Sequence, residues 1–321
     1  MKNLVLSRYA LSCCVAAAML AGCGGSQPPI GASGAMPQTS VSAAHVERDG
    51  SWMLPEATSD DLLYVTNYSY VSVYSYPEGK LVGTLKSFYS SVGECVDAKG
   101  DVFVTDDSPS KVYEYAHGGT KRIASFPTGR AGARGCAISP TTGDLAISGF
   151  SNYVEIYRGA TGKGIARRDK EMSYGGFDTY DEKGNLFFLG LKNSKGRQQL
   201  SELPNGSTEF RSIRLDANTY DLGGIQWNNG YLTTVSDTRQ TGLYQFQITG
   251  TKGHKVSSTT LGQPAYIVLQ YFIDGKTVVV PNLGNPGTNV LYYKYPAGGK
   301  PGFILTKDVT DARGVVVSRD T

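Results

Sequence analysis

An apolar segment rich in small residues recurs along the chain, and each internal copy is followed by a polar turn ending in glycine and a second apolar segment. The five turn glycines stand 43, 41, 46 and 45 residues apart, at Gly100, Gly143, Gly184, Gly230 and Gly275. From Leu62 onward, short alternating strands are bounded by Gly, Asn, Asp and Pro, and no stretch of a dozen residues keeps a helical apolar period. A period in the low forties with four strands per unit is the spacing of propeller blades.

A second repeated feature, a strand with alternating aromatic residues, runs in phase with the turn glycines. Residues 73–80, 112–119 and 291–300 share such a strand and a glycine turn after it, and Tyr157 and Tyr244 hold the same place in other units. Tyrosine at every second position suits a half-buried pleated face, because the ring packs inward while the hydroxyl reaches the rim.

The two ends of the repeat region complement each other. The last apolar segment, residues 312–318, has no second strand after it, whereas residues 62–67 look like a second strand that lacks a first. Joining them completes one unit and removes open sheet edges. We therefore predict an all-β, six-bladed β-propeller whose C-terminal strand joins the N-terminal blade, as one domain over residues 62–321. The expected units are 62–86 with 314–318, then 93–126, 134–168, 174–215, 221–261 and 263–306.

Residues 1–22 are predicted to be a signal peptide rather than part of the fold. Lys2 and Arg8 give a basic start, and the apolar stretch after them is too short to span a bilayer as a helix. The stretch ends in Leu20-Ala21-Gly22-Cys23, which resembles the lipobox of bacterial lipoproteins. The resemblance implies cleavage before Cys23 and acylation of that cysteine by palmitate-type chains.

Two or more acyl chains hold a protein stably on a membrane, so we expect an exported, lipid-anchored protein. Gly24 in the position after the cysteine favours the outer membrane, on its periplasmic or its surface side. The outer face of the plasma membrane is the alternative location. An ordinary signal peptide that happens to contain a cysteine remains the other interpretation of the first 23 residues.

The mature chain has little net charge. The whole sequence has 31 Lys and Arg against 28 Asp and Glu; removing residues 1–22 takes away two basic residues, which leaves a net charge of about +1. Such a balance does not favour nucleic acid as a partner. Residues 23–50 are predicted to be a flexible tether, and the more apolar residues 51–61, with Trp52, are expected to dock on the folded body.

The repeats resemble those of NHL-type and gluconolactonase-like six-bladed propellers over nearly all of residues 62–321. With the strands of a blade lettered A to D from the axis outward, the D–A and B–C loops of such propellers gather around one channel mouth. That face usually carries the site. The resemblance therefore assigns nine candidate binding residues to the channel face: Asn67, Glu94, Asp106, Asp107, Arg134, Tyr174, Asp237, Asn282 and Arg313.

Carboxylates and amides that converge on a channel are the oxygen ligands that a hard cation such as Ca²⁺ takes. By resemblance to the lactonase-like enzymes, Glu94 with Asp106 and Asp237 would then serve a divalent-metal-dependent hydrolase. The competing interpretation is that the aspartates cap B–C turns, where Asp is favoured for local backbone bonding. Histidine chemistry is not expected, because His45, His117 and His254 all fall away from the predicted mouth.

The tyrosine content suggests a binding surface. The chain has 21 tyrosines, and Tyr68, Tyr70, Tyr89 and Tyr174 fall in predicted loops or at strand ends. Exposed aromatic rings suit stacking on sugars or contact with a partner protein, although scattered packing at the rim is the plainer interpretation. We predict a monomeric, non-enzymatic binding or scaffold module of the cell envelope without a cofactor, and the metal-dependent hydrolase is the alternative.

The two cysteines left in the mature domain are predicted to form a disulfide. Cys95 and Cys136 stand five and seven residues before Gly100 and Gly143, at nearly the same point of consecutive A strands. Neighbouring A strands lie side by side around the axis, and an exported protein folds in an oxidising compartment. Two buried free thiols are the alternative.

Overall fold

The computed structural model describes residues 45–46, 49–192, 197–220, 223–236, 242–262, 268–284 and 288–321. The expected signal peptide and the lipidation site at Cys23 lie outside the described residues. Within these ranges the chain forms β-strands and two short 3-10 helices, η1 (Pro55–Thr58) and η2 (Arg158–Ala160). The all-β prediction is confirmed.

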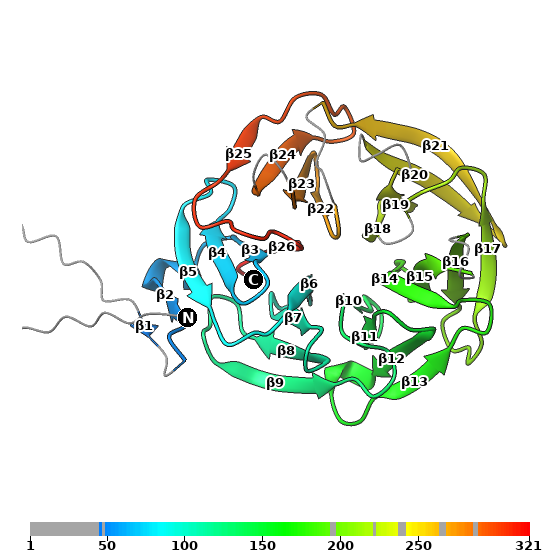
Figure 1. Ribbon diagram of the computed structural model, residues 1–321, viewed down its shortest axis with the longest axis horizontal. Helices are drawn as coiled ribbons and strands as arrows, with labels where there is room; N and C mark the ends of the chain where they lie inside the picture. Colours follow the sequence, from blue (N-terminus) through cyan, green and yellow to red (C-terminus); the bar gives the residue numbers. More distant parts are fainter. Residues whose placement is uncertain are drawn as a thin grey trace, which may run out of the picture. The chain divides into compact units, whose positions relative to one another are not determined.

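The strands form sheets that follow one another around a ring, with the first strand of each unit nearest the axis (Figure 1). Three sheets are four-stranded and antiparallel. The first has β6 (Ser91–Val96), β7 (Val102–Asp106), β8 (Lys111–Tyr115) and β9 (Arg122–Pro127). The second has β10 (Gly135–Ile138), β11 (Leu145–Ser148), β12 (Tyr153–Tyr157) and β13 (Ile165–Arg168). The third has β22 (Phe272–Asp274), β23 (Thr277–Asn282), β24 (Asn289–Lys294) and β25 (Phe303–Leu305).

The largest sheet has eight strands and two antiparallel halves. One half has β14 (Tyr174–Tyr180), β15 (Leu186–Leu191), β16 (Gln198–Leu203) and β17 (Arg211–Leu215). The other has β18 (Ile225–Asn228), β19 (Tyr231–Val235), β20 (Gly242–Thr249) and β21 (Lys252–Thr260). The halves meet through a short parallel pairing, Arg214 with Lys252 and Leu215 with Gly253. The units expected at 174–215 and 221–261 therefore share one hydrogen-bonded sheet, because the long outer strand β21 reaches the outer strand of the unit before it.

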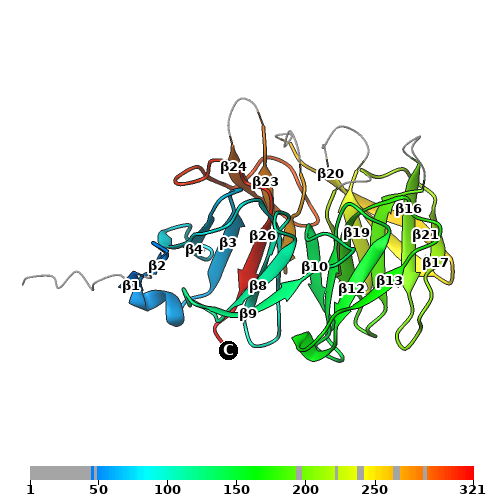
Figure 2. The ribbon, with the colours of Figure 1, turned by 60° about the horizontal axis from the view of Figure 1, so that its bottom comes forward.

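The remaining sheet joins the two ends of the described chain. Its order is β1 (His45–Val46), β2 (Trp52–Met53), β5 (Leu81–Leu85), β4 (Val71–Ser75), β3 (Leu62–Thr66) and β26 (Val315–Ser318). Strand β26 pairs antiparallel with β3 over its whole length, from Val315 opposite Val65 to Ser318 opposite Leu62. Figure 2 shows β26 beside β3, with the C-terminus at one end of the ring. The expected joining of C-terminal and N-terminal strands is confirmed.

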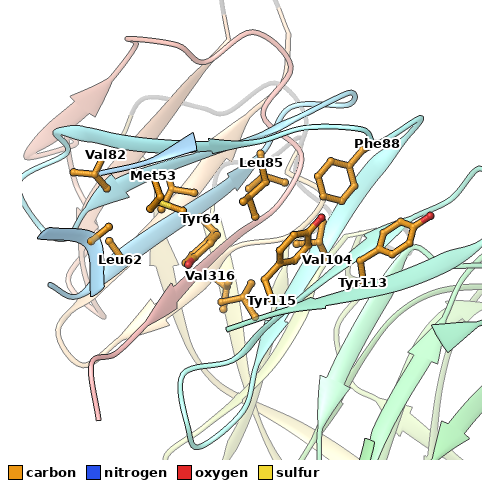
Figure 3. Packing of buried hydrophobic residues seen from close by; sticks show 14 residues of the cluster. Met53, Leu62, Tyr64, Val82, Leu85, Phe88, Val104, Tyr113, Tyr115 and Val316 are labelled. Atoms are coloured by element: carbon orange, nitrogen blue, oxygen red, sulfur yellow. The ribbon is translucent and has the colours of Figure 1, made fainter. Parts of the chain in front are cut away.

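The segment 51–61 docks on this sheet, as its apolar residues predicted. Strand β2 adds to the outer edge of β5, with Trp52 opposite Thr84 and Met53 opposite Gly83. Gly83 leaves room for Met53, because a Cβ at this position would lie 2.9 Å from the Met53 methyl group and would force that side chain to shift. Met53 belongs to a buried cluster that also contains Tyr64, Tyr115 and Val316, so the segment seals the junction between the first two units (Figure 3).

Hydroxyl groups on the second strands hold neighbouring first strands together near the axis. Thr66 Oγ1 accepts from Gly314 N–H at 2.8 Å and donates to the Val92 carbonyl of the next unit at 2.8 Å. Thr105 Oγ1 likewise lies 3.1 Å from the Arg134 carbonyl, and Ser148 Oγ lies 3.1 Å from the Gly176 carbonyl. The C-terminal end of each of these three second strands is therefore fixed to the following unit by a hydrogen bond.

Candidate functional site

Two arginine–aromatic stacks lie at the end of the ring where the D–A and B–C loops meet. The Arg134 guanidinium carbon lies 4.0 Å from the ring centroid of Phe150, and that of Arg313 lies 4.5 Å from the centroid of Tyr68. Each arginine comes from an Ala-Arg-Gly segment at the start of an A strand, and each aromatic residue stands two positions after the neighbouring B strand. Both stacks are therefore built in the same way, in units separated by the β6–β9 sheet.

The Arg134 guanidinium is poorly compensated. Burial lowers its pKa, Asp107 and Tyr174 act in the opposite direction, and Arg313 adds to the lowering. Its Nε is buried and has no hydrogen-bond partner among the described residues. Arg313 instead donates to the Asp311 carboxylate at 3.0 Å. Arg134 thus keeps hydrogen-bonding capacity at this mouth, and an anionic group is what a guanidinium fork recognises best.

Exposed aromatic rings surround these arginines. Tyr68, Tyr89, Phe150 and Tyr174 are 45%, 72%, 38% and 37% exposed. Phe150 and Tyr174 stack with their centroids 4.8 Å apart and their planes at 27°. The other large apolar side chains that are exposed among the described residues lie on the outer strands β9, β21 and β25. We call Tyr68, Tyr89, Arg134, Phe150, Tyr174 and Arg313 the aromatic–arginine face.

Two polar candidate residues at this mouth already accept hydrogen bonds from backbone N–H groups of neighbouring loops. Asp106 accepts from the N–H groups of Tyr89, at 3.1 Å, and Ser90, at 2.7 Å. Asn67 Oδ1 accepts from Thr310 N–H at 2.9 Å, which ties the first B–C loop to the last D–A connection. Both side chains hold D–A connections in place, which differs from the expected capping of the B–C turns.

Three further candidates complete the mouth. The half-buried Asp107 is close enough to Arg134 to act on its pKa. Asn282 Nδ2 donates to Asn289 Oδ1 at 3.2 Å across the β23–β24 turn. Asp237 lies outside the described residues. No group of three or more His, Cys, Asp or Glu among the described residues is placed to hold a metal ion.

Glu94 belongs to a second place, a cavity of about 390 Å³ on the ring axis. We call this the axial cavity. Its lining comes from the later parts of the A strands and the turns after them, so it opens toward the A–B turns, away from the aromatic–arginine face. Its carboxyl groups are those of Glu94, Asp178, Asp181 and Glu182, and its lining contains no Lys, Arg or His. Trp227, Phe272 and Val316 supply part of the apolar wall.

The two deepest carboxyl groups share a structural origin. Glu94 follows a shift of register between β6 and β7, and Asp178 follows the equivalent shift between β14 and β15. A β-bulge changes the direction of the side chains after it, and it often does so beside a functional site. Glu94 is 1% exposed and Asp178 is 4% exposed. Burial raises the pKa of Glu94 well above its ordinary value and raises the pKa of Asp178 to about 7.

The predicted disulfide is present in the wall of the axial cavity. The Cys95 and Cys136 sulfurs are 2.09 Å apart and the Cα atoms are 5.7 Å apart. The bond joins β6 to β10, the A strands of consecutive units, so the two cysteines do occupy corresponding positions. It fixes β6, the strand that carries Glu94, to β10.

The described histidines take structural positions. His117 lies in the turn between β8 and β9, and its Nδ1 is 2.6 Å from Ser318 Oγ, which ties that turn to the end of β26. His254 lies within the long strand β21, with its Nδ1 3.2 Å from Asp216 Oδ2. The alternating polar residues around it form an exposed outer strand, which has a weak signal in sequence. His45 lies in the two-residue strand β1.

Sequence analysis missed Phe150 and Asp178. The repeated Ala-Arg-Gly at 133–135 and 312–314 was a usable signal for Phe150, since Tyr68 stands at the same place in its own unit. Asp178 had no comparable signal, because the register shift that turns it inward is not visible in the residue pattern.

Comparison with solved structures shows which known folds this chain resembles. No family model and no curated protein matches the sequence. A solved protein of unknown function from Bacteroides caccae matches with a TM-score of 0.63 at 11% identity, over 81% of this chain and 100% of the other. A chain of a nidogen/laminin complex matches with a TM-score of 0.62 at 14% identity, over 81% and 99%. At such identities the likeness is one of fold, and it shows a β-propeller-like ring.

Within the described ranges, no helix has both the length and the apolar character needed to cross a membrane.

Proposed function

We propose that this protein is a six-bladed β-propeller, anchored to a membrane of the cell envelope through Cys23, that binds an acidic carbohydrate on the aromatic–arginine face without catalysing a reaction. The observation that carries the binding proposal is the pair of arginine–aromatic stacks, surrounded by exposed rings at one mouth of the ring.

Six blades account best for the packing. The eight-stranded sheet consists of two halves with the four-strand pattern of the other sheets, and only two residue pairs join them. The buried apolar side chains form six clusters, each between two neighbouring four-strand units. Six such junctions are what a closed ring of six blades requires.

The chemistry of the face suits a sugar acid. The apolar C–H face of a sugar ring packs on a flat aromatic side chain, and the exposed rings of Tyr68 and Tyr174 offer such surfaces. A carboxylate or phosphate on the sugar would pair with the Arg134 guanidinium, which is held over the Phe150 ring at this mouth. Guanidinium groups prefer such planar anions to neutral hydroxyls.

The binding proposal is tested with oligogalacturonate and its methyl ester, in which a methyl group neutralises each carboxylate. We expect the acid form to bind more tightly than the ester, and Arg134→Ala and Tyr174→Ala each to weaken binding of the acid at least tenfold in calorimetric titration. Arg158→Ala and Phe303→Ala are matched controls, because both residues are exposed and lie in a C–D turn and an outer strand. Equal affinity for acid and ester, or no effect of either mouth variant, would contradict the proposal.

The hydrolase alternative is weaker on these contacts. Glu94 and Asp106 were expected to act together, but Asp106 bonds to the Tyr89 and Ser90 amides at the mouth, whereas Glu94 lines the axial cavity. Glu94→Gln and Asp106→Asn should therefore leave the response of the melting temperature to added calcium as it is in the parent. An upward shift with calcium that both variants abolish would favour the hydrolase.

A further inference from the structure

The axial cavity carries an inference that is independent of the aromatic–arginine face. It is a space of about 390 Å³ whose lining has four carboxyl groups and no basic side chain. Acidic residues often gather at a surface without binding anything, so the state of each carboxyl group decides what this cavity can do.

Two of the four carboxyl groups are already occupied. Asp181 accepts from the backbone N–H and the side-chain amide of Asn185, both at 2.7 Å, and so closes a turn. Glu182 accepts a hydrogen bond from the Trp227 indole. These two groups form the rim of the cavity and hold Trp227 in place.

The other two, Glu94 and Asp178, retain free oxygens in a buried site. Neither oxygen of Glu94 has a hydrogen-bond partner among the described residues, and Asp178 binds Ser148 Oγ at 2.7 Å through one oxygen while its Oδ2 has none. A buried polar atom without a partner costs about 1–3 kcal/mol, more when charged, so an empty cavity of this kind is unfavourable. Both groups line the cavity, and a ligand that donates hydrogen bonds would satisfy them.

The cavity is bounded on the side of the mouth by Gln270. Its side-chain amide pairs with the backbone of Glu94, accepting from the N–H at 2.7 Å and donating to the carbonyl at 2.5 Å. A Cβ on Gly314 would lie 2.7 Å from Gln270 Oε1, so glycine is needed where this amide crosses β26. Glu94 therefore lines a space that is reached from the A–B turn end, and neighbouring atoms cover its two unpaired oxygens.

We propose that the axial cavity binds an organic ammonium ion, whose nitrogen donates hydrogen bonds to Glu94 and Asp178 while its apolar body lies against Trp227. The Trp227 ring stacks on Phe187 with centroids 5.1 Å apart, which fixes it as a flat wall beside the carboxyl groups. An ammonium supplies up to three donors and a compensating charge, and an aromatic wall also attracts a cation. A bare metal ion fits less well, because the described residues offer no group of three ligands and the cavity is much larger than an ion.

The proposal predicts a proton exchange on binding. In the free protein, burial favours the protonated form of Glu94. The ammonium favours the ionised forms of Glu94 and of Asp178, whose pKa is about 7, so protons pass from these carboxyl groups to the buffer. The enthalpy of binding at pH 7 should therefore change with the ionisation enthalpy of the buffer, for example between phosphate and Tris.

The test uses the full-length protein with phenethylamine as the probe and 2-phenylethanol as its neutral counterpart. We expect phenethylamine to bind at least tenfold more tightly than the alcohol in calorimetric titration. Glu94→Gln and Asp178→Asn should each weaken the amine at least tenfold, and each should reduce the buffer dependence. Glu209→Gln is the control, because its side chain is 76% exposed on the outside of the ring, and it should bind the amine as the parent does.

Three outcomes would overturn the proposal. The first is equal affinity for the amine and the alcohol, which would make the cavity a site for apolar molecules. The second is amine binding that neither Glu94→Gln nor Asp178→Asn changes. The third is calcium that competes with the amine and raises the melting temperature in the parent only, which would assign the carboxyl groups to a metal.

Discussion

The C-terminal strand β26 is the most direct place to test how the ring is held. We predict that shortening a side chain in β26 lowers the free energy of unfolding much more than the same substitution in an exposed strand. Val315 is fully buried, pairs with Val65 of β3, and belongs to the cluster between the first and last units. Val315→Ala removes two methyl groups at about 0.8 kcal/mol each and leaves a small cavity, for a total cost of about 2–3 kcal/mol.

The matched control is Val256→Ala in β21. Val256 is 48% exposed and is also in a strand, so the loss of strand preference is common to both variants and the difference reports burial. For a domain of this length, about 2–3 kcal/mol corresponds to a fall of roughly 4–6 °C in melting temperature. Urea unfolding of the two variants and the parent measures the difference directly. If Val315→Ala costs no more than Val256→Ala, β26 does not hold the ring.

Three further predictions concern the disulfide, the buried carboxyl groups and the anchor. Replacing both Cys95 and Cys136 by Ser opens a loop of 41 residues and should cost roughly 4 kcal/mol in urea unfolding, whereas an unchanged midpoint would contradict this. Burial raises the pKa of Asp178 from 3.8 to about 7, so the stability that comes from keeping its proton is complete below about pH 4 and is lost as the pH rises through 7. The free energy of unfolding of the parent should therefore fall by about 4 kcal/mol between pH 4 and pH 8.5, and Asp178→Asn should remove this fall. A parent and an Asp178→Asn variant with parallel stability curves over that range would show that the carboxyl group is not desolvated. Cys23→Ala should move the protein out of the membrane fraction, and acylated, membrane-bound Cys23→Ala protein would refute the lipid anchor.

The parts of the fold that depend on spacing could be predicted from sequence. The turn glycines gave the period, and the phase of Cys95 and Cys136 relative to Gly100 and Gly143 placed both thiols at one level of adjacent strands. Equivalent positions of neighbouring repeats lie side by side, so two residues at the same position of adjacent units can be expected to be neighbours without knowledge of their contacts. The residues 51–61 were recognised as a docking segment for a simpler reason, since they are apolar beside a polar tether.

The parts that depend on local irregularity could not be predicted. Asp178 and Glu94 turn toward the axis because one register shift precedes each of them, and a glycine shortly before a carboxyl group does not by itself specify such a shift. The parallel pairing of β17 with β21 depends on the length of an outer strand with mixed exposure, which sequence patterns do not measure. The sequence also did not show that Asp106 accepts hydrogen bonds from the amides of Tyr89 and Ser90, which lie 17 and 16 residues before it.

The pairing of β26 with β3 also sets the order in which the molecule can be finished. Val65 is made early, but its partner Val315 is made 250 residues later. At about 5–20 residues per second, the inner edge of β3 stays without its partner for roughly 12–50 s of synthesis. During that time an apolar strand with free backbone groups is open to pairing with other chains. A chain that ends before β26 keeps this edge of β3 unpaired.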